Sequence, residues 1–106
     1  MFNQFFITGI LVSMPSSLSH QNDYLIYLKV KKPYDEYDPA HNYVKLPVLL
    51  WPGLARRISD EAVVGSILEV KGRLLNKAED VNTIILKAES CQILDYDLQQ
   101  LMKKKK

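Results

Sequence analysis

Two segments of the chain, residues 24 to 31 and 43 to 51, alternate between two kinds of side chain. A two-residue period is typical of a β-strand with one face in a core and the other in solvent. In both segments one face is aliphatic or aromatic, and the other mixes apolar and aromatic groups with lysines. We therefore expect two strands of a β-rich domain. The predicted inner face comprises Tyr24, Ile26, Leu28, Val30, Val44, Leu46, Val48 and Leu50, and the outer face comprises Leu25, Tyr27, Lys29, Lys31, Tyr43, Lys45, Pro47, Leu49 and Trp51.

Three more strands and one short helix complete the predicted order. Residues 2 to 12 are apolar on both sides, which is typical of a strand covered on both faces, and another subunit is one possible cover. Five strands with a helix between the third and the fourth is the order of an OB-fold, an all-β barrel. The predicted strands span residues 2 to 12, 24 to 31, 43 to 51, 66 to 75 and 83 to 94, the helix spans residues 54 to 64, and loops fill residues 13 to 22, 32 to 42 and 76 to 82.

Two residues predict local irregularities in these strands. Pro47 cannot donate a ladder hydrogen bond, so we expect a bulge or an unpaired stretch there. Gly72 is expected to mark the tight bend of a small barrel.

Length and charge limit the organisation of the chain. With 106 residues it forms one domain, predicted to span residues 1 to 97, followed by a short segment with a lysine tail at residues 98 to 106. The net charge is +2, but the last four residues are all lysine, and the rest of the chain holds ten basic and twelve acidic residues. Any role with nucleic acid must therefore depend on where the charges lie. Many basic residues fall in or beside predicted strands and most acidic ones in predicted loops or ends, which predicts a basic sheet face with acidic edges.

Catalytic and cofactor chemistry has no support in the sequence. The lone Cys91 lies in an apolar strand pattern and is expected to fill the core. His20 and His41 lie in separate predicted loops without neighbouring cysteines, so we expect no metal site. No glycine-rich phosphate loop, nucleophile elbow or His-anchored catalytic pair occurs. We therefore expect a protein that is not an enzyme, uses no cofactor and takes no small-molecule substrate.

The sequence also bears on location. No apolar run approaches the roughly 20 residues that span a bilayer. The first dozen residues lack the basic leader and small-residue cleavage site of a signal peptide. We expect a cytoplasmic protein that does not associate with membranes.

The block from Asn42 to Leu75 resembles the central part of bacterial single-stranded DNA-binding proteins. In that family a strand ending in a pattern like VVWGKLAE runs into a short helix, and a strand reading GSxVxVxGRL follows. Here the matching stretches read VLLWPGLA at residues 48 to 55 and GSILEVKGRL at residues 65 to 74. The resemblance continues into the other predicted strands and covers residues 2 to 95. It implies a five-stranded OB-fold Greek-key barrel with one short helix between strands 3 and 4.

The resemblance also implies a function. Binding single strands without sequence preference needs aromatic faces for the bases and cations for the phosphates, and the predicted outer faces supply both. Tyr43 and Trp51 stand where the family places stacking aromatics. The expected function is sequence-independent binding of single-stranded DNA that protects or presents exposed strands in replication, recombination or repair. The candidate binding residues are Tyr27, Tyr43 and Trp51 for stacking and Lys29, Lys31, Lys45, Arg56, Lys71 and Arg73 for the phosphates.

Three departures from the family leave alternatives open. The chain ends in lysines where the family has an acidic tail that recruits partners, Pro52 and Gly53 follow Trp51 where a basic residue is common, and the predicted loop at residues 76 to 82 is short. The expected partners are single-stranded DNA, a second copy of the chain in a dimer or tetramer, and replication proteins. A replication-restart accessory protein of the same ancestry is one alternative, and an OB-fold that joins proteins is another. RNA is also open as the nucleic acid, because none of these residues reads a 2′-hydroxyl.

Overall fold

A closed five-stranded barrel forms the body of the protein. The structure is a computed structural model that describes residues 1–18, 22–33, 37 and 39–94. Around the barrel the strands follow the order β1, β2, β3, β5, β4 and back to β1. The single parallel pair, β3 with β5, closes the barrel, and the other neighbours are antiparallel. The elements are β1 (Phe5–Ser17), β2 (Tyr24–Lys31), a 3₁₀ turn (Pro39–His41), β3 (Tyr43–Leu50), α1 (Pro52–Glu61), β4 (Ile67–Lys77) and β5 (Asp80–Ile93).

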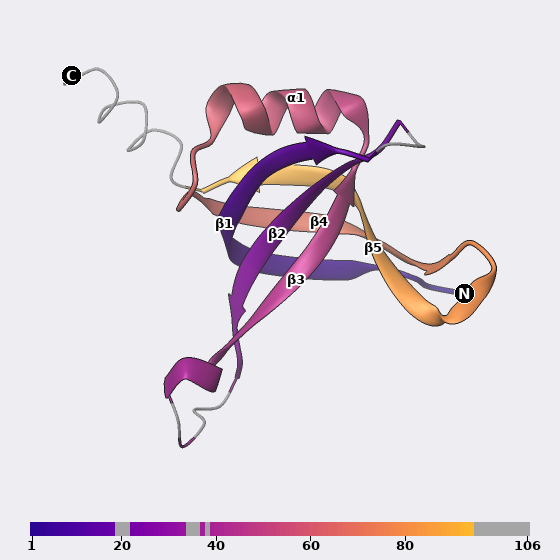
Figure 1. Ribbon diagram of the computed structural model, residues 1–106, viewed down its shortest axis with the longest axis horizontal. Helices are drawn as coiled ribbons and strands as arrows, with labels where there is room; N and C mark the ends of the chain where they lie inside the picture. Colours follow the sequence, from indigo (N-terminus) through magenta and orange to yellow (C-terminus); the bar gives the residue numbers. More distant parts are fainter. Residues whose placement is uncertain (19–21, 34–36, 38, 95–106) are drawn as a thin grey trace.

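The arrangement in space places three features around this barrel (Figure 1). Helix α1 lies across one end, the β2–β3 hairpin extends away from the other, and the β4–β5 hairpin projects to one side with the N-terminus beside it. The five strands with one helix between β3 and β4 confirm the predicted OB-fold. Among the described residues, no helix reaches the length and apolarity needed to cross a bilayer.

The core confirms the two faces that alternation predicts for β2 and β3. Ile26, Leu28, Val48 and Leu50 are completely buried, whereas the side chains between them point outward. Aliphatic side chains from all five strands and α1 fill the barrel, and their burial supplies the main driving force for folding. The other buried apolar residues are Leu11, Leu54, Ala55, Ile58, Ala62, Leu68, Val70, Ala88, Cys91 and Ile93.

The position of helix α1 is set by its N-terminal residues and by contacts of its residues with the barrel. Pro52 occupies its first turn, where a proline loses no helical hydrogen bond, and Trp51 is the N-cap residue. Leu54, Ala55 and Ile58 face the barrel, and Arg57 donates a hydrogen bond of 2.5 Å to the carbonyl oxygen of Cys91 in β5. The helix therefore closes the barrel end with its apolar face. It starts two residues earlier and stops three residues earlier than the predicted range of 54 to 64.

Two predicted loops prove wrong. Residues 13 to 17 continue β1, because after pairing with β4 this strand crosses to β2 and pairs with it across two register shifts. Pro15 lies at the second of these shifts, where a strand tolerates a proline. Most of residues 76 to 82 extend β4 and β5, and the turn between them is confined to residues 78 and 79, where Glu79 has a φ of 66°. Cross-strand pairing thus outweighs the local preference of these polar residues for loops.

The predicted bulge at Pro47 is also wrong, whereas the bend at Gly72 is confirmed. The β2–β3 register passes Pro47, which faces Tyr27, without a shift. On its other side, β3 pairs with β5 only from Val48 onward. The N–H that Pro47 lacks is therefore not required by the β3–β5 ladder. At Gly72 the β4–β5 register shifts, and a Cβ atom there would lie 1.9 Å from the carbonyl oxygen of Lys87. Only glycine allows this close approach of the two backbones.

Several predictions fall on residues outside the described part of the chain. These are the boundary between residues 97 and 98, the lysine tail and His20.

Candidate nucleic-acid interface

The outer face of β2 and β3 carries an alternating pattern of tyrosine and lysine. The antiparallel register sets Tyr27 opposite Pro47, Lys29 opposite Lys45, and Lys31 opposite Tyr43. Each tyrosine therefore has a lysine diagonally across the strand pair, within reach of a long side chain. We call the surface formed by Tyr27, Lys29, Lys31, Tyr43 and Lys45 the tyrosine–lysine face.

Two cation–π contacts define the geometry of this face. The Nζ atom of Lys29 lies 4.4 Å from the centroid of the Tyr43 ring, and Nζ of Lys45 lies 4.8 Å from the centroid of the Tyr27 ring. Such contacts hold flexible lysine side chains against the sheet. Aromatic surface and positive charge are consequently interleaved at the spacing of neighbouring side chains.

Among the described residues, no acidic side chain forms an ion pair with the lysines of this face. Lys29 and Lys45 stand directly opposite each other, and like charges in that arrangement repel. In the described part of the chain, the ion pairs join Arg57 to Glu61, Arg73 to Glu89, and Lys87 to Asp23, so none involves these two lysines. Both lysines are exposed. An anion bound between them would relieve their repulsion.

Trp51 continues the aromatic surface toward α1. It follows the last residue of β3, eight residues beyond Tyr43, which corresponds to about 26 Å along an extended strand. Its side chain is 47% exposed and Tyr43 is 40% exposed, while Tyr27 between them is half-buried. The apolar pair Leu25 and Leu49 lies between Tyr27 and Trp51 on the same outer face. An exposed aromatic track therefore runs from the hairpin loop to the start of the helix.

Arg73 shares the outer sheet face, but its charge is neutralised. The register aligns Leu49 of β3 with Lys87 of β5 and Lys87 with Arg73 of β4. The Nη2 atom of Arg73 lies 2.8 Å from a carboxylate oxygen of Glu89, and Lys87 pairs with Asp23. Lys87 is a cation beside the track that was missing from the predicted site. The alternation of the last strand could have indicated its outward direction, but not its neighbours.

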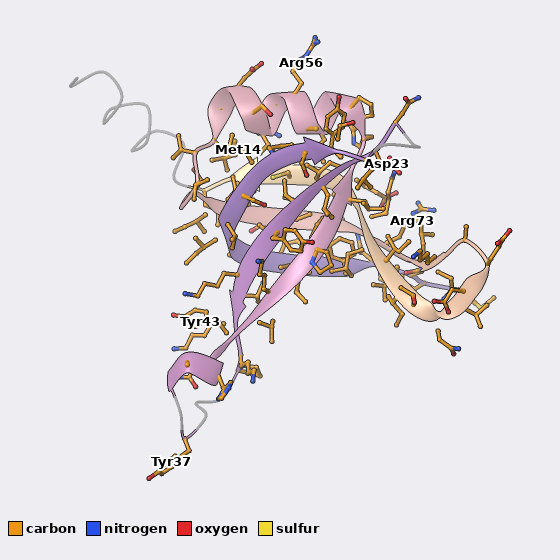
Figure 2. All side chains as sticks on the ribbon, in the orientation of Figure 1. Met14, Asp23, Tyr37, Tyr43, Arg56 and Arg73 are labelled. Atoms are coloured by element: carbon orange, nitrogen blue, oxygen red, sulfur yellow. The ribbon has the colours of Figure 1, made fainter. Side chains whose placement is uncertain are left out.

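The structure does not bring Arg56 or Lys71 to the tyrosine–lysine face. Arg56 lies on the outside of α1 and points away from the barrel, far from Tyr43 (Figure 2). Lys71 pairs with Phe6 of β1 and Ser90 of β5, on a part of the barrel that neither β2 nor β3 forms. Six of the nine predicted residues thus line one continuous track, namely Tyr27, Lys29, Lys31, Tyr43, Lys45 and Trp51, with Arg73 two strands away.

Cys91 is part of the core, as predicted. Its side chain is 6% exposed, and burial raises the pKa of the thiol to about 11, although the nearby Arg57 guanidinium opposes the shift. A thiol that stays protonated is a poor nucleophile. Within the described residues, no group of three or more His, Cys, Asp or Glu side chains is placed to hold a metal ion.

Comparison with solved structures places this barrel among those of single-stranded DNA-binding proteins. Mitochondrial single-stranded DNA-binding protein Rim1 of S. cerevisiae superposes with a TM-score of 0.67 at 12% identity, over 89% of this chain and 94% of that one. The small single-stranded DNA-binding protein of Streptomyces coelicolor gives 0.58 at 18% identity, over 88% and 95%. The dimeric N-terminal domain of PriB from Thermoanaerobacter tencongensis gives 0.62 at 14% identity, over 87% and 96%.

These likenesses establish the fold. The chain is an OB-fold barrel of the type found in single-stranded DNA-binding proteins and PriB, which confirms at the level of structure the resemblance seen in the sequence. No family model matches the sequence. No curated protein matches it either.

Proposed function

We propose that this protein binds single-stranded DNA without sequence preference, and that the tyrosine–lysine face and Trp51 form the binding track. The observation that carries the proposal is the interleaving, on adjacent strands, of tyrosine rings with lysines that form no ion pair with a described residue. Bases stack on any aromatic face, and stacking contributes roughly 1–3 kcal/mol per base whatever the sequence. Phosphates would occupy the space between Lys29 and Lys45, where they relieve the repulsion of the two ammonium groups.

The track offers no means of reading a base sequence. Its groups are tyrosine and tryptophan rings, lysine ammonium groups and aliphatic side chains, and none is an amide or guanidinium placed for paired hydrogen bonds to a base edge. The role that suits such a surface is to protect or present exposed strands in replication, recombination or repair. We expect a binding activity without a catalytic step, in the cytoplasm.

A titration with unlabelled oligothymidine tests the proposal, because Trp51 is the only tryptophan. We expect its fluorescence to be quenched on binding, and the affinity to fall as salt rises. Duplex DNA of equal length is the control and should compete poorly. Oligouridine tests RNA in the same format. Absence of binding, by quenching and by anisotropy of a labelled oligonucleotide, would refute the proposal.

We further propose that the protein forms a homo-oligomer through the outer face of β1 and β4. Phe6 is 62% exposed, and the paired Ile10 and Ile67 are 38% and 40% exposed, so an isolated barrel leaves apolar side chains in water on both sides of the Thr8–Glu69 pair. Ile10 lies opposite Lys29, so this surface adjoins the tyrosine–lysine face. Sedimentation velocity should show a dimer or larger species that Phe6→Lys shifts toward monomer. A monomeric wild-type protein would contradict it.

A module that joins proteins is the second candidate function. The observation that favours it is the exposure of Phe6, Ile10 and Ile67 on β1 and β4, because exposed apolar side chains can also pack against a different protein chain. In that case the aromatic track would be free of nucleic acid, and the oligothymidine titration separates the two candidates directly.

A further inference from the structure

The indole of Trp51 lies over the backbone of Gly53, at the first turn of α1. A Cβ atom built on Gly53 would lie 2.0 Å from Cζ3 of the indole, 2.7 Å from Cη2 and 2.8 Å from Cε3. These are the three nearest atoms to that position, and all belong to the six-membered ring. Real side chains do not tolerate such distances, so a side chain at residue 53 and the observed ring position exclude each other.

Conformational strain does not explain the glycine. The positive-φ glycine of the described chain is Gly65, whereas residue 53 lies inside α1 with helical backbone. Within a helix, alanine is favoured over glycine because glycine loses more backbone entropy. The glycine at residue 53 is thus unfavourable for the helix, and the space it leaves is filled by the indole.

We infer that Gly53 is a positioning residue that holds the Trp51 ring in its binding position before a strand arrives. The inference rests on the proposed function, since it concerns how one stacking residue of the track is kept in place. Trp51 is attached to the end of β3 and has only two side-chain torsions. A fixed ring gives up little entropy when a base stacks on it, which is the advantage of preorganisation. In the family that the sequence resembles, a basic residue is common close after the aromatic residue. Here residue 53 is a glycine, and the indole of Trp51 occupies the space beside it.

The test compares Gly53→Ala with Ser59→Ala, an exposed alanine substitution on the same helix. In the free protein, Gly53→Ala should change the emission maximum of Trp51 and its quenching by acrylamide, because the ring must leave its place. Ser59→Ala should leave both unchanged. The fold of both variants is checked by circular dichroism, and Gly53→Ala is expected to fold because the displaced group is the end of a side chain.

Binding to oligothymidine is then measured by anisotropy of a labelled strand for the wild type, Gly53→Ala, Trp51→Ala and the double variant. We expect Gly53→Ala and Trp51→Ala each to lose roughly tenfold in affinity, the effect of removing one stacked base. The double variant should bind no more weakly than Trp51→Ala, because Gly53 acts only through the ring.

The outcomes separate the two proposals. A wild-type protein that does not bind would overturn the proposed function, and the role of Gly53 with it. A wild type that binds, with Gly53→Ala equally tight or with an unchanged Trp51 spectrum, would overturn the positioning role alone. A double variant much weaker than Trp51→Ala would also overturn it, because Gly53 would then contribute through another route.

Discussion

At the residue scale, the lysines of the tyrosine–lysine face add little to the stability of the free protein. The direct opposition of Lys29 and Lys45 costs free energy of folding, whereas each ammonium group gains a contact with a tyrosine ring. The repulsion and each single ring contact are of similar size, roughly 0.5–1 kcal/mol, so one ring contact offsets the repulsion in the free protein. We expect a phosphate bound between the two ammonium groups to remove this repulsion.

This balance predicts different effects on stability and on binding. Substituting Lys29→Gln or Lys45→Gln removes one repulsion and one cation–π contact, so the free energy of unfolding should change by less than about 0.5 kcal/mol. Affinity for oligothymidine should nevertheless fall several-fold in moderate salt. Urea unfolding and anisotropy titrations measure the two quantities. Lys77→Gln, on the distant β4–β5 turn, is the matched control, and an equal loss of affinity there would argue against a localised track.

Cys91 predicts how stability depends on pH. Burial raises the pKa of the folded thiol to about 11, above its ordinary value of 9.0. The unfolded chain therefore releases this proton at lower pH than the folded one, so stability is unaffected below pH 9 and falls as pH rises from 9 to 11. Cys91→Ser or Cys91→Ala should flatten this part of the stability curve, measured by urea unfolding. A wild-type curve that is flat over the same range would contradict the assigned burial.

At the scale of elements, the β4–β5 hairpin extends beyond the barrel and is tied to the N-terminal segment. The side-chain amide of Asn3 donates to the carbonyl oxygen of Leu74 at 2.8 Å and accepts from its N–H at 3.0 Å. This side chain therefore completes the β4 ladder just beyond Gly72, where β1 begins to pair. The hairpin exposes Leu74, Leu75, Val81 and Ile84 to solvent.

Asn3→Ala should loosen the hairpin without unfolding the barrel. Two exposed hydrogen bonds are lost, for which we expect about 1 kcal/mol of local stability. Hydrogen exchange of the Leu74 amide should accelerate, while amides of Ile26 and Val48 in the core should keep their protection. Gln4→Ala, a neighbouring exposed substitution, serves as the control. Uniform acceleration across the barrel would show that the N-terminal segment stabilises the whole fold instead.

Some of these elements were predictable from the sequence and others were not, for a physical reason. The inner faces of β2 and β3 follow from alternation because each side chain points either in or out. Residues 13 to 17 and 76 to 82 resemble loops locally, yet they are strands because partners distant in sequence pair with them. Site residues on one hairpin were likewise predictable. Barrel closure and register decide that Lys71 faces Phe6, that Arg56 points away and that Arg73 pairs with Glu89.

At the scale of the whole molecule, three exposed lysines lie together on the β2–β3 hairpin. Lys29, Lys31 and Lys45 are the cations of the proposed track outside the described ion pairs. Three phosphate contacts predict a slope of about −2 for log affinity against log salt on single strands. Deleting residues 103 to 106 tests whether the lysine tail adds to this, since its contribution would make the wild-type slope steeper. Equal slopes would show that the tail takes no part.

The short pairing between β3 and β5 determines where the barrel opens most easily. Its ladder consists of Val48 opposite Leu86 and Leu49 opposite Lys87, whereas the antiparallel ladders run much further. Beside this short ladder, the ion pair between Lys87 and Asp23 links β5 to the residue that precedes β2. Thermal fluctuations should break this ion pair and the β3–β5 pairing first. The closed barrel would then become an open sheet with β3 as an edge strand. In that open form the β2–β3 pairing, and with it the tyrosine–lysine face, would stay intact.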